Sequence, residues 1–244
     1  MTSRASRDPA SRRTHAERRA SADGYFAPES VIRRVGSSPL VPLLGGGPAV
    51  LLQVAHPLVA AGVADHSAYA RELWRRLLRT LRALYLVTFG TKAEAERAAA
   101  GVRAAHARVR GVTREPLGPF PAGTPYAADD PELQLWVHAT LVAMSLAVTC
   151  RFVEPLTAEE QERYYREMAV VGRLFGLPRS TIPRTLTDFR RYLDEELASG
   201  RISVTEPARR IARVILDPPL PLPMRMLVPA HRLATAGLLP PQVR

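Results

Sequence analysis

The chain of 244 residues is long enough to form one domain with a hydrophobic core of its own. Hydrophobic residues make up 46% of it and charged residues 23%, a composition that excludes disorder over most of the chain. Because Cys150 is the single cysteine, an intramolecular disulfide, a thiolate zinc site, an iron–sulfur cluster and a CxxCH haem attachment are all excluded within one chain.

The charge is strongly basic: 34 Lys and Arg residues against 23 Asp and Glu residues give a net charge of +11, and Lys92 is the only lysine. Such an arginine excess, beside abundant Ala and Pro, favours the coding bias of a GC-rich bacterial genome over selection for nucleic acid. Residues 1–22 are basic and lack apolar periodicity, so we predict a disordered tail followed by one domain over 23–244. No apolar segment follows Arg12 and Arg13, so no export signal is predicted and a cytoplasmic location is expected.

The spacing of apolar residues, punctuated by Pro and Gly, predicts an all-α fold, a single compact domain of about eight helices. The predicted helices cover 48–64, with a kink or break at Pro57, and then 68–88, 92–110, 130–152, 158–175, 181–198, 205–215 and 221–236. No segment alternates as a strand does, and residues 111–129, rich in Pro and Gly, are predicted to form a loop. We expect Asp130 to cap the helix that begins at Pro131.

Two stretches, 35–64 and 133–150, contain no Asp, Glu, Lys or Arg. Seven Pro and Gly residues between Pro39 and Pro57 argue against a lipid-exposed helix in the first stretch, and the second is barely long enough to span a bilayer. Both are interpreted as buried helices of a protein without a transmembrane segment. A peripheral membrane contact is the alternative.

The helix predicted over 68–88 carries an apolar face made of Leu73, Leu77, Leu81 and Leu84. Thr80 lies within the same arc, Arg76 lies at its edge, and Arg79 lies about sixty degrees further round. A guanidinium at the margin of a buried face favours a planar anion such as a carboxylate. That anion belongs either to a bound ligand or to an Asp or Glu of a neighbouring helix.

His106 lies at the centre of a stripe of small apolar residues on the next predicted helix: Ala95, Ala99, Val102 and Val109. Alanines and valines let a large planar body approach a helix closely, and the one imidazole in the row would reach a metal at its centre. This is the geometry that a haem requires. The alternative is a core histidine whose ring is hydrogen-bonded to a carbonyl group.

His138 shares a face with Ser145 and Thr149 on an otherwise apolar helix. Such polar groups must be hydrogen-bonded, either within the protein or to a bound molecule. Both interpretations stay open. Near the break at Pro57, Asp65 either orients the imidazole of His56 or His66, or it or Ser67 caps the following helix.

Short segments of the chain, in order, resemble the haem-dependent oxygenases grouped around the fungal mycophenolic-acid pathway enzyme MpaB and the bacterial latex-clearing proteins. The resemblance covers Val50 to Leu239. Its landmarks are Leu52-Gln53-Val54-Ala55-His56-Pro57, Asp65-His66-Ser67, Arg76-Leu77-Leu78-Arg79-Thr80, Phe89-Gly90, His106-Ala107-Arg108-Val109-Arg110-Gly111, Trp136-Val137-His138-Ala139-Thr140 and Thr235-Ala236-Gly237-Leu238-Leu239-Pro240.

The resemblance implies an all-α domain that encloses haem b, with His106 as the iron ligand and His138 near the pocket. In latex-clearing proteins an Arg-x-x-Lys-Thr segment lies over the haem, and Arg76, Arg79 and Thr80 match it here. Arg79 replaces the lysine, and a guanidinium stays protonated and cannot donate a lone pair to iron. The resemblance therefore implies that Arg79 hydrogen-bonds iron-bound oxygen or a haem propionate and that Arg76 or Arg79 pairs with the propionates. Arg79, Thr80 and His138 are the expected catalytic residues.

The family implies an oxygenase that acts on an apolar, isoprenoid-like small molecule with O2 or peroxide, and that recognises no specific nucleic acid. Two alternatives belong to other classes: a non-catalytic haem-binding sensor or carrier, and a haem-free basic helical module that binds nucleic acid or anionic membrane. Alkene turnover separates the first alternative from the enzyme. The second predicts no Soret absorption and strongly salt-dependent binding.

Overall fold

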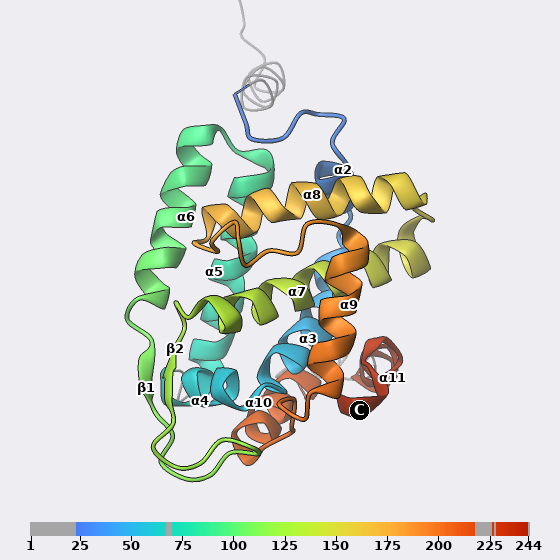
Figure 1. Cartoon of the computed structure of the whole chain (residues 1–244). Helices are drawn as coiled ribbons and strands as arrows, with labels where there is room; N and C mark the ends of the chain where they lie inside the picture. The colour runs from blue at the N-terminus through green and yellow to red at the C-terminus, as the bar shows by residue number, and fades with distance from the viewer. Residues whose placement is uncertain (1–22, 67–69, 218–225, 227, 244) are drawn as a thin grey trace, which may run out of the picture.

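The computed structural model describes residues 23–66, 70–217, 226 and 228–243. The predicted disordered tail, Ser67 and part of the helix predicted over 221–236 lie outside these residues, as does the side chain of Leu73. The all-α prediction is confirmed (Figure 1). The helices are α2 (Val31–Ser37), α3 (Leu40–Val54), α4 (Pro57–His66), α5 (Ala70–Phe89), α6 (Lys92–His106), α7 (Pro131–Val148), α8 (Ala158–Leu174), α9 (Leu186–Ala198), α10 (Glu206–Leu216) and α11 (Val228–Leu238).

Helix α7 runs through the middle of the molecule, with α3 packed along it, α8 across it and α5 and α6 to one side (Figure 1). The fully buried side chains of Trp136 and Val142 anchor α7 in the main core. Asp130 caps α7 as expected: its carboxylate accepts hydrogen bonds from the backbone N–H groups of Glu132, at 2.8 Å, and Leu133, at 3.3 Å. The charge-free stretch 133–150 is therefore a core helix.

The sequence prediction missed α2 and the first half of α3. Three consecutive glycines and Pro48 argue against a helix, because glycine and proline are poor helix formers. Packing overrides that preference, since a Cβ at Gly45 would lie 3.3 Å from Cγ2 of Val148 on α7. The glycines therefore let α3 lie close to α7, and the predicted break at Pro57 is confirmed, with α3 ending at Val54.

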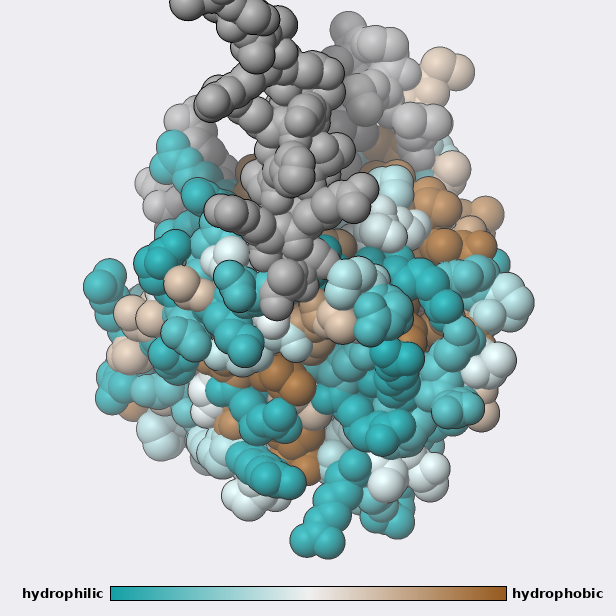
Figure 2. All heavy atoms as spheres, turned by 90° about the horizontal axis from the view of Figure 1, so that it is seen from above, coloured by the Kyte–Doolittle hydropathy of each residue, from teal (hydrophilic) through white to brown (hydrophobic). Residues whose placement is uncertain are grey.

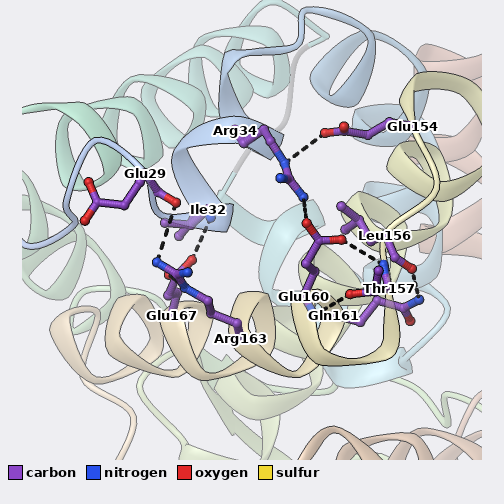
Figure 3. A network of polar contacts seen from close by, with 10 residues as sticks. All are labelled: Glu29, Ile32, Arg34, Glu154, Leu156, Thr157, Glu160, Gln161, Arg163 and Glu167. Carbon is purple, nitrogen blue, oxygen red and sulfur yellow. Dashed lines mark hydrogen bonds and ion pairs between the residues drawn. The ribbon is translucent and has the colours of Figure 1, made fainter.

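A polar network fixes α2 on α8 (Figure 3). The backbone N–H of Ile32 donates to a carboxylate oxygen of Glu167 at 2.6 Å. Arg34 forms ion pairs with Glu154 at 3.0 Å and with Glu160 at 2.5 Å. Glu160 also closes a capping box with Thr157 at the start of α8. These contacts attach the N-terminal helix to the core.

The region between α6 and α7 corrects the prediction of a featureless loop. Strands β1 (Arg110–Val112) and β2 (Pro125–Ala127) pair antiparallel, with Gly111 opposite Tyr126. Helix α6 consequently ends at His106 rather than at residue 110, because the chain must turn into β1. Two other boundaries differ: a π-helical segment, η1 (Thr149–Val153), ends α7, and α9 begins at Leu186 because Thr185 caps it.

By length and apolar composition, the helical stretch 131–153 could cross a membrane, but 56% of its most apolar window is buried inside the fold. Helices α2 and α3 meet the same criteria only as a pair, and they bend by 91° at their junction. Burial of this kind is typical of a core helix.

We predict that Leu52→Ala lowers the free energy of unfolding by about 2–5 kcal/mol, because it leaves a cavity in a packed core. Leu52 on α3 is 0% exposed, whereas Leu43 on the same helix is 65% exposed. Leu43→Ala is the matched control and should change the free energy by less than about 0.5 kcal/mol. Urea unfolding of both variants measures the difference, and equal effects would contradict the packing described here.

Candidate functional site

An interior cavity of about 210 Å³ lies between α3, α4, α5, α6 and α7, with α8 and α10 at its ends. Its walls are mostly aliphatic, and small residues let the helices approach it from several sides. These small residues are Gly46, Ala49, Gly62, Ala83, Ala127, Ala128 and Gly172. Such a space suits a planar or elongated apolar molecule.

Seven polar side chains interrupt the apolar lining: Gln53, Arg76, Thr80, His106, Tyr126, Gln134 and His138. Within the described lining residues, Arg76 is the only permanently charged group and none is acidic. The cavity therefore offers two imidazoles and one guanidinium in apolar surroundings. This combination suits a ligand with an apolar body and an anionic edge.

His106 is the last residue of α6, and its ring reaches the cavity with Val102. Ala99 and Ala95, about two and three turns before His106 on the same face, are fully buried against the core. The ring atom Nδ1 is buried and has no hydrogen-bond partner. Burial, and next the positive charge of Arg76, lower the pKa of His106, so that the imidazole is neutral.

His138 lies on α7 and faces α8 across the cavity wall. Its Nε2 is buried without a hydrogen-bond partner, and a Cβ at Gly172 would lie 3.2 Å from it. Burial lowers the pKa of His138 to about 4. The polar residues predicted to share this face therefore differ in their hydrogen bonding. Thr149 donates to the backbone oxygen of Ser145 at 2.7 Å, whereas one ring nitrogen of His138 has no partner.

Of the three site residues predicted on α5, two line the cavity and one does not. Arg76 is half-buried and lines the cavity, and burial followed by the charge of Arg79 lowers its pKa. Thr80 also lines the cavity and donates its hydroxyl proton to the backbone oxygen of Arg76 at 3.0 Å. Arg79 is exposed and lies outside the lining.

Asp65 lies within α4, and no described hydrogen bond joins it to an imidazole; residues 67–69, which precede α5, lie outside the described residues. It accepts the hydroxyl proton of Tyr126 at 2.5 Å, while burial, and next this hydrogen bond, raise the pKa of Tyr126 to about 12. His56 lines an adjoining surface groove with Phe120 and Arg201, and this groove shares Leu58, Tyr126, Ala127 and Leu133 with the cavity. The structure therefore brings together Arg76, Thr80, His106 and His138, and leaves His56 and Arg79 outside the cavity.

Sequence reasoning missed Tyr126, Gln53 and Gln134 as lining residues. Tyr126 comes from β2, in a segment without apolar periodicity, so no local pattern indicates its partner Asp65. Gln53 is fixed by the indole of Trp136, which donates to its backbone oxygen at 3.1 Å. Only the tertiary packing brings these residues to one cavity.

The described residues contain no group of three or more His, Cys, Asp or Glu side chains able to hold a bare metal ion. A macrocycle that supplies four ligands itself needs only one or two from the protein. The neutral imidazole of His106, the aliphatic walls and the single guanidinium fit such a group.

Comparison with known families decides the relationship. The family described as ER-bound oxygenase mpaB/B'/Rubber oxygenase, catalytic domain, matches residues 33–244. The chain belongs to this family. Uncharacterized proteins of Mycobacterium tuberculosis and Mycobacterium bovis are similar to it, each 27% identical over 202 residues that cover 80% of this chain and 75% of the relative. No solved structure matches.

Membership in the mpaB/rubber oxygenase family confirms the resemblance drawn from the short motifs and identifies an oxygenase-type catalytic domain. The match includes every residue that lines the cavity. The cavity is therefore the candidate active site of the domain.

The burial of a neutral imidazole predicts acid destabilisation. An exposed histidine titrates near pH 6.5, and the pKa of His138 is about 4. The unfolded chain therefore binds a proton that the folded chain does not as the pH falls from about 6.5 to about 4, and the free energy of unfolding decreases through that interval. The loss from this residue is on the order of 3 kcal/mol.

Urea unfolding of the haem-free protein at about pH 7 and about pH 4.5 measures the effect. His138→Leu should shrink the difference between the two pH values, because it removes the titrating group. His66→Ala, at an exposed position on α4, should keep the wild-type difference. A wild-type difference in His138→Leu would contradict the buried, neutral assignment.

Proposed function

We propose that this protein is a haem b-dependent oxygenase that acts on an apolar, isoprenoid-like small molecule with O2 or peroxide. The observation that carries the proposal is the neutral, partly unsatisfied imidazole of His106 on the wall of an apolar cavity in an oxygenase-family domain. We expect the reaction to take place in the cytoplasm.

His106 would hold the haem iron through one imidazole nitrogen. Its place at the end of α6 supports this role, since the capping box of Thr91 and Glu94 fixes the start of that helix and the buried Ala95 and Ala99 fix its face. The low pKa of His106 keeps the lone pair that a metal requires.

Arg76 would pair with a haem propionate, because a guanidinium in apolar surroundings gains most from a carboxylate. Arg79 is exposed on α5, and its positive charge acts on the cavity by lowering the pKa of Arg76. The hydroxyl of Thr80 donates its hydrogen bond to the backbone oxygen of Arg76, so on the cavity wall its oxygen can act only as an acceptor. The sequence expectation that either arginine pairs with propionates thus narrows to Arg76.

A bound haem would supply the site at which O2 or peroxide is activated. The aliphatic lining would bind an apolar substrate and exclude water. His138 offers one neutral nitrogen, Nε2, without a partner, and this atom can donate or accept a hydrogen bond according to its tautomer. It is the residue of the cavity best suited to hold a proton beside the substrate.

The test of the cofactor is the visible spectrum of the haem-reconstituted protein. We expect stoichiometric Soret absorption in the wild type and in the His66→Ala control, and its loss in His106→Ala. Equal absorption in all three proteins would remove His106 from the iron. Oxygen consumption with a panel of isoprenoid alkenes then distinguishes the oxygenase from a haem carrier, which would consume none.

The test of the propionate contact is haem affinity. Arg76→Gln should weaken haem binding about tenfold or more, because a hydrogen bond to a charged group contributes about 1.5–3 kcal/mol. Arg75→Gln, at the exposed neighbouring position, removes the same charge and should leave the affinity within about twofold. Equal losses would indicate a general electrostatic effect. The measurement is transfer of haem to apomyoglobin.

A further inference from the structure

Another depression in the described part of the molecule lies between α8, the segment 175–185 and α9. Its volume is about 1220 Å³, and it shares no lining residue with the candidate active site. We call it the α8–α9 groove. It is lined by Tyr165, Arg166, Ala169, Arg173, Arg179, Ser180, Thr181, Ile182, Pro183, Arg184, Asp188, Arg191, Tyr192 and Glu195.

The charges of the groove are unbalanced. Five arginines face two carboxylates, Asp188 and Glu195, whereas the whole chain has 34 basic and 23 acidic residues. Arg191 forms ion pairs with both carboxylates, at 2.7 Å to Asp188 and at 4.0 Å to Glu195. Arg166 lies 3.9 Å from Glu162. Five positive charges against two negative ones give the described lining of the groove a net charge of +3.

Three of the arginines form no ion pair with a described residue: Arg173, Arg179 and Arg184. Elsewhere on α8, Arg163 is paired with Glu167 at 3.3 Å. Like charges held around one depression repel each other unless an anion lies between them. The three free guanidinium groups together present a strong positive field to an anion.

The groove is rigid enough to be a preformed site. The hydroxyl of Tyr165 donates to the backbone oxygen of Pro183 at 2.7 Å, which ties the segment 175–185 to α8. Three residues further along the chain, the backbone N–H of Leu186 donates to Glu162 at 2.9 Å, so both bonds fix the end of the segment that leads into α9. Arginines that extend from a fixed frame lose less entropy when they bind an anion.

The chemistry of the lining selects phosphate groups. Guanidinium groups pair with phosphate oxygens through two parallel hydrogen bonds, and several of them suit clustered phosphates better than one carboxylate. Ser180 and Thr181 add hydroxyl groups, while Ile182, Ala169 and the ring of Tyr192 provide an apolar surface for an organic part. The groove thus combines a polyanion-binding edge with an apolar floor.

We propose that the α8–α9 groove is a binding site for a small molecule that carries a diphosphate or similarly clustered phosphates. Arg173, Arg179 and Arg184 bind the phosphates, and the apolar floor contacts the organic part. The site is separate from the candidate active site, although Gly172, Phe175 and Leu177 of the adjoining segment line that cavity. It does not depend on the haem proposal.

Isothermal titration calorimetry of the full-length protein with inorganic pyrophosphate, at about 0.15 M salt, tests the proposal. We expect saturable binding that weakens at least tenfold in the triple variant Arg173→Gln, Arg179→Gln, Arg184→Gln. The matched control is Arg209→Gln, Arg210→Gln, Arg213→Gln on α10, which removes the same charge from exposed positions. The control should bind pyrophosphate within about twofold of the wild type.

A second arm distinguishes the sources of phosphate. Vesicles that contain phosphatidic acid test a lipid headgroup, and their capture by the wild type but not by the groove variant would assign the same site to a lipid phosphate. Soret absorption of the groove variant should equal that of the wild type, which separates failure here from failure of the haem proposal.

Three results would overturn the proposal. The first is the absence of both pyrophosphate and vesicle binding in the wild type, and the second is equal weakening in the groove and control variants, which would indicate non-specific attraction. The third is tighter binding of poly-glutamate than of pyrophosphate, lost in the groove variant, which would assign the surface to an acidic protein.

Discussion

The structure depends on the burial of α7 between helices that approach it closely. The stretch from Leu133 to Cys150 contains no charged residue, so burying it against apolar side chains is favourable on most sides of the helix. Glycines allow those contacts, since a Cβ at Gly45 of α3 or at Gly172 of α8 would press on Val148 or His138 of α7. The same close approach that closes the core therefore encloses an imidazole beside the cavity.

Burial also sets the electrostatics of the candidate active site. His106 and His138 are neutral because burial makes their charged forms costly, and at His106 the charge of Arg76 adds to this effect while Asp129 only partly offsets it. A neutral imidazole is a metal ligand or a hydrogen-bond donor and acceptor, whereas an imidazolium is only a donor. The cavity thus derives its chemical capacity mainly from desolvation, whereas hydrophilic residues cover much of the face of the molecule that Figure 2 shows.

The segment between α8 and α9 lies at the boundary of two environments. Its first residues, Phe175 and Leu177, line the apolar cavity, and its later arginines surround the basic α8–α9 groove. The chain changes from one environment to the other within a few residues. Tyr165 fixes this transition through its bond to Pro183. A short segment of the chain therefore connects the apolar cavity with the basic α8–α9 groove.

The sequence by itself determined the helical class, the break at Pro57, the cap at Asp130 and the place of Arg76, Thr80, His106 and His138 on or beside the apolar faces of their own helices, because helical periodicity and capping are local properties. Tertiary packing brought these four residues, from three helices, to one cavity. Tertiary structure alone decided that α3 forms through its glycines, that α6 ends at His106, that Asp65 binds Tyr126 and that Arg79 lies outside the cavity. The physical reason is the range of the interactions: the pairing of β1 with β2 and the packing of α3 on α7 join residues far apart in the chain, and these long-range contacts outweigh local preference.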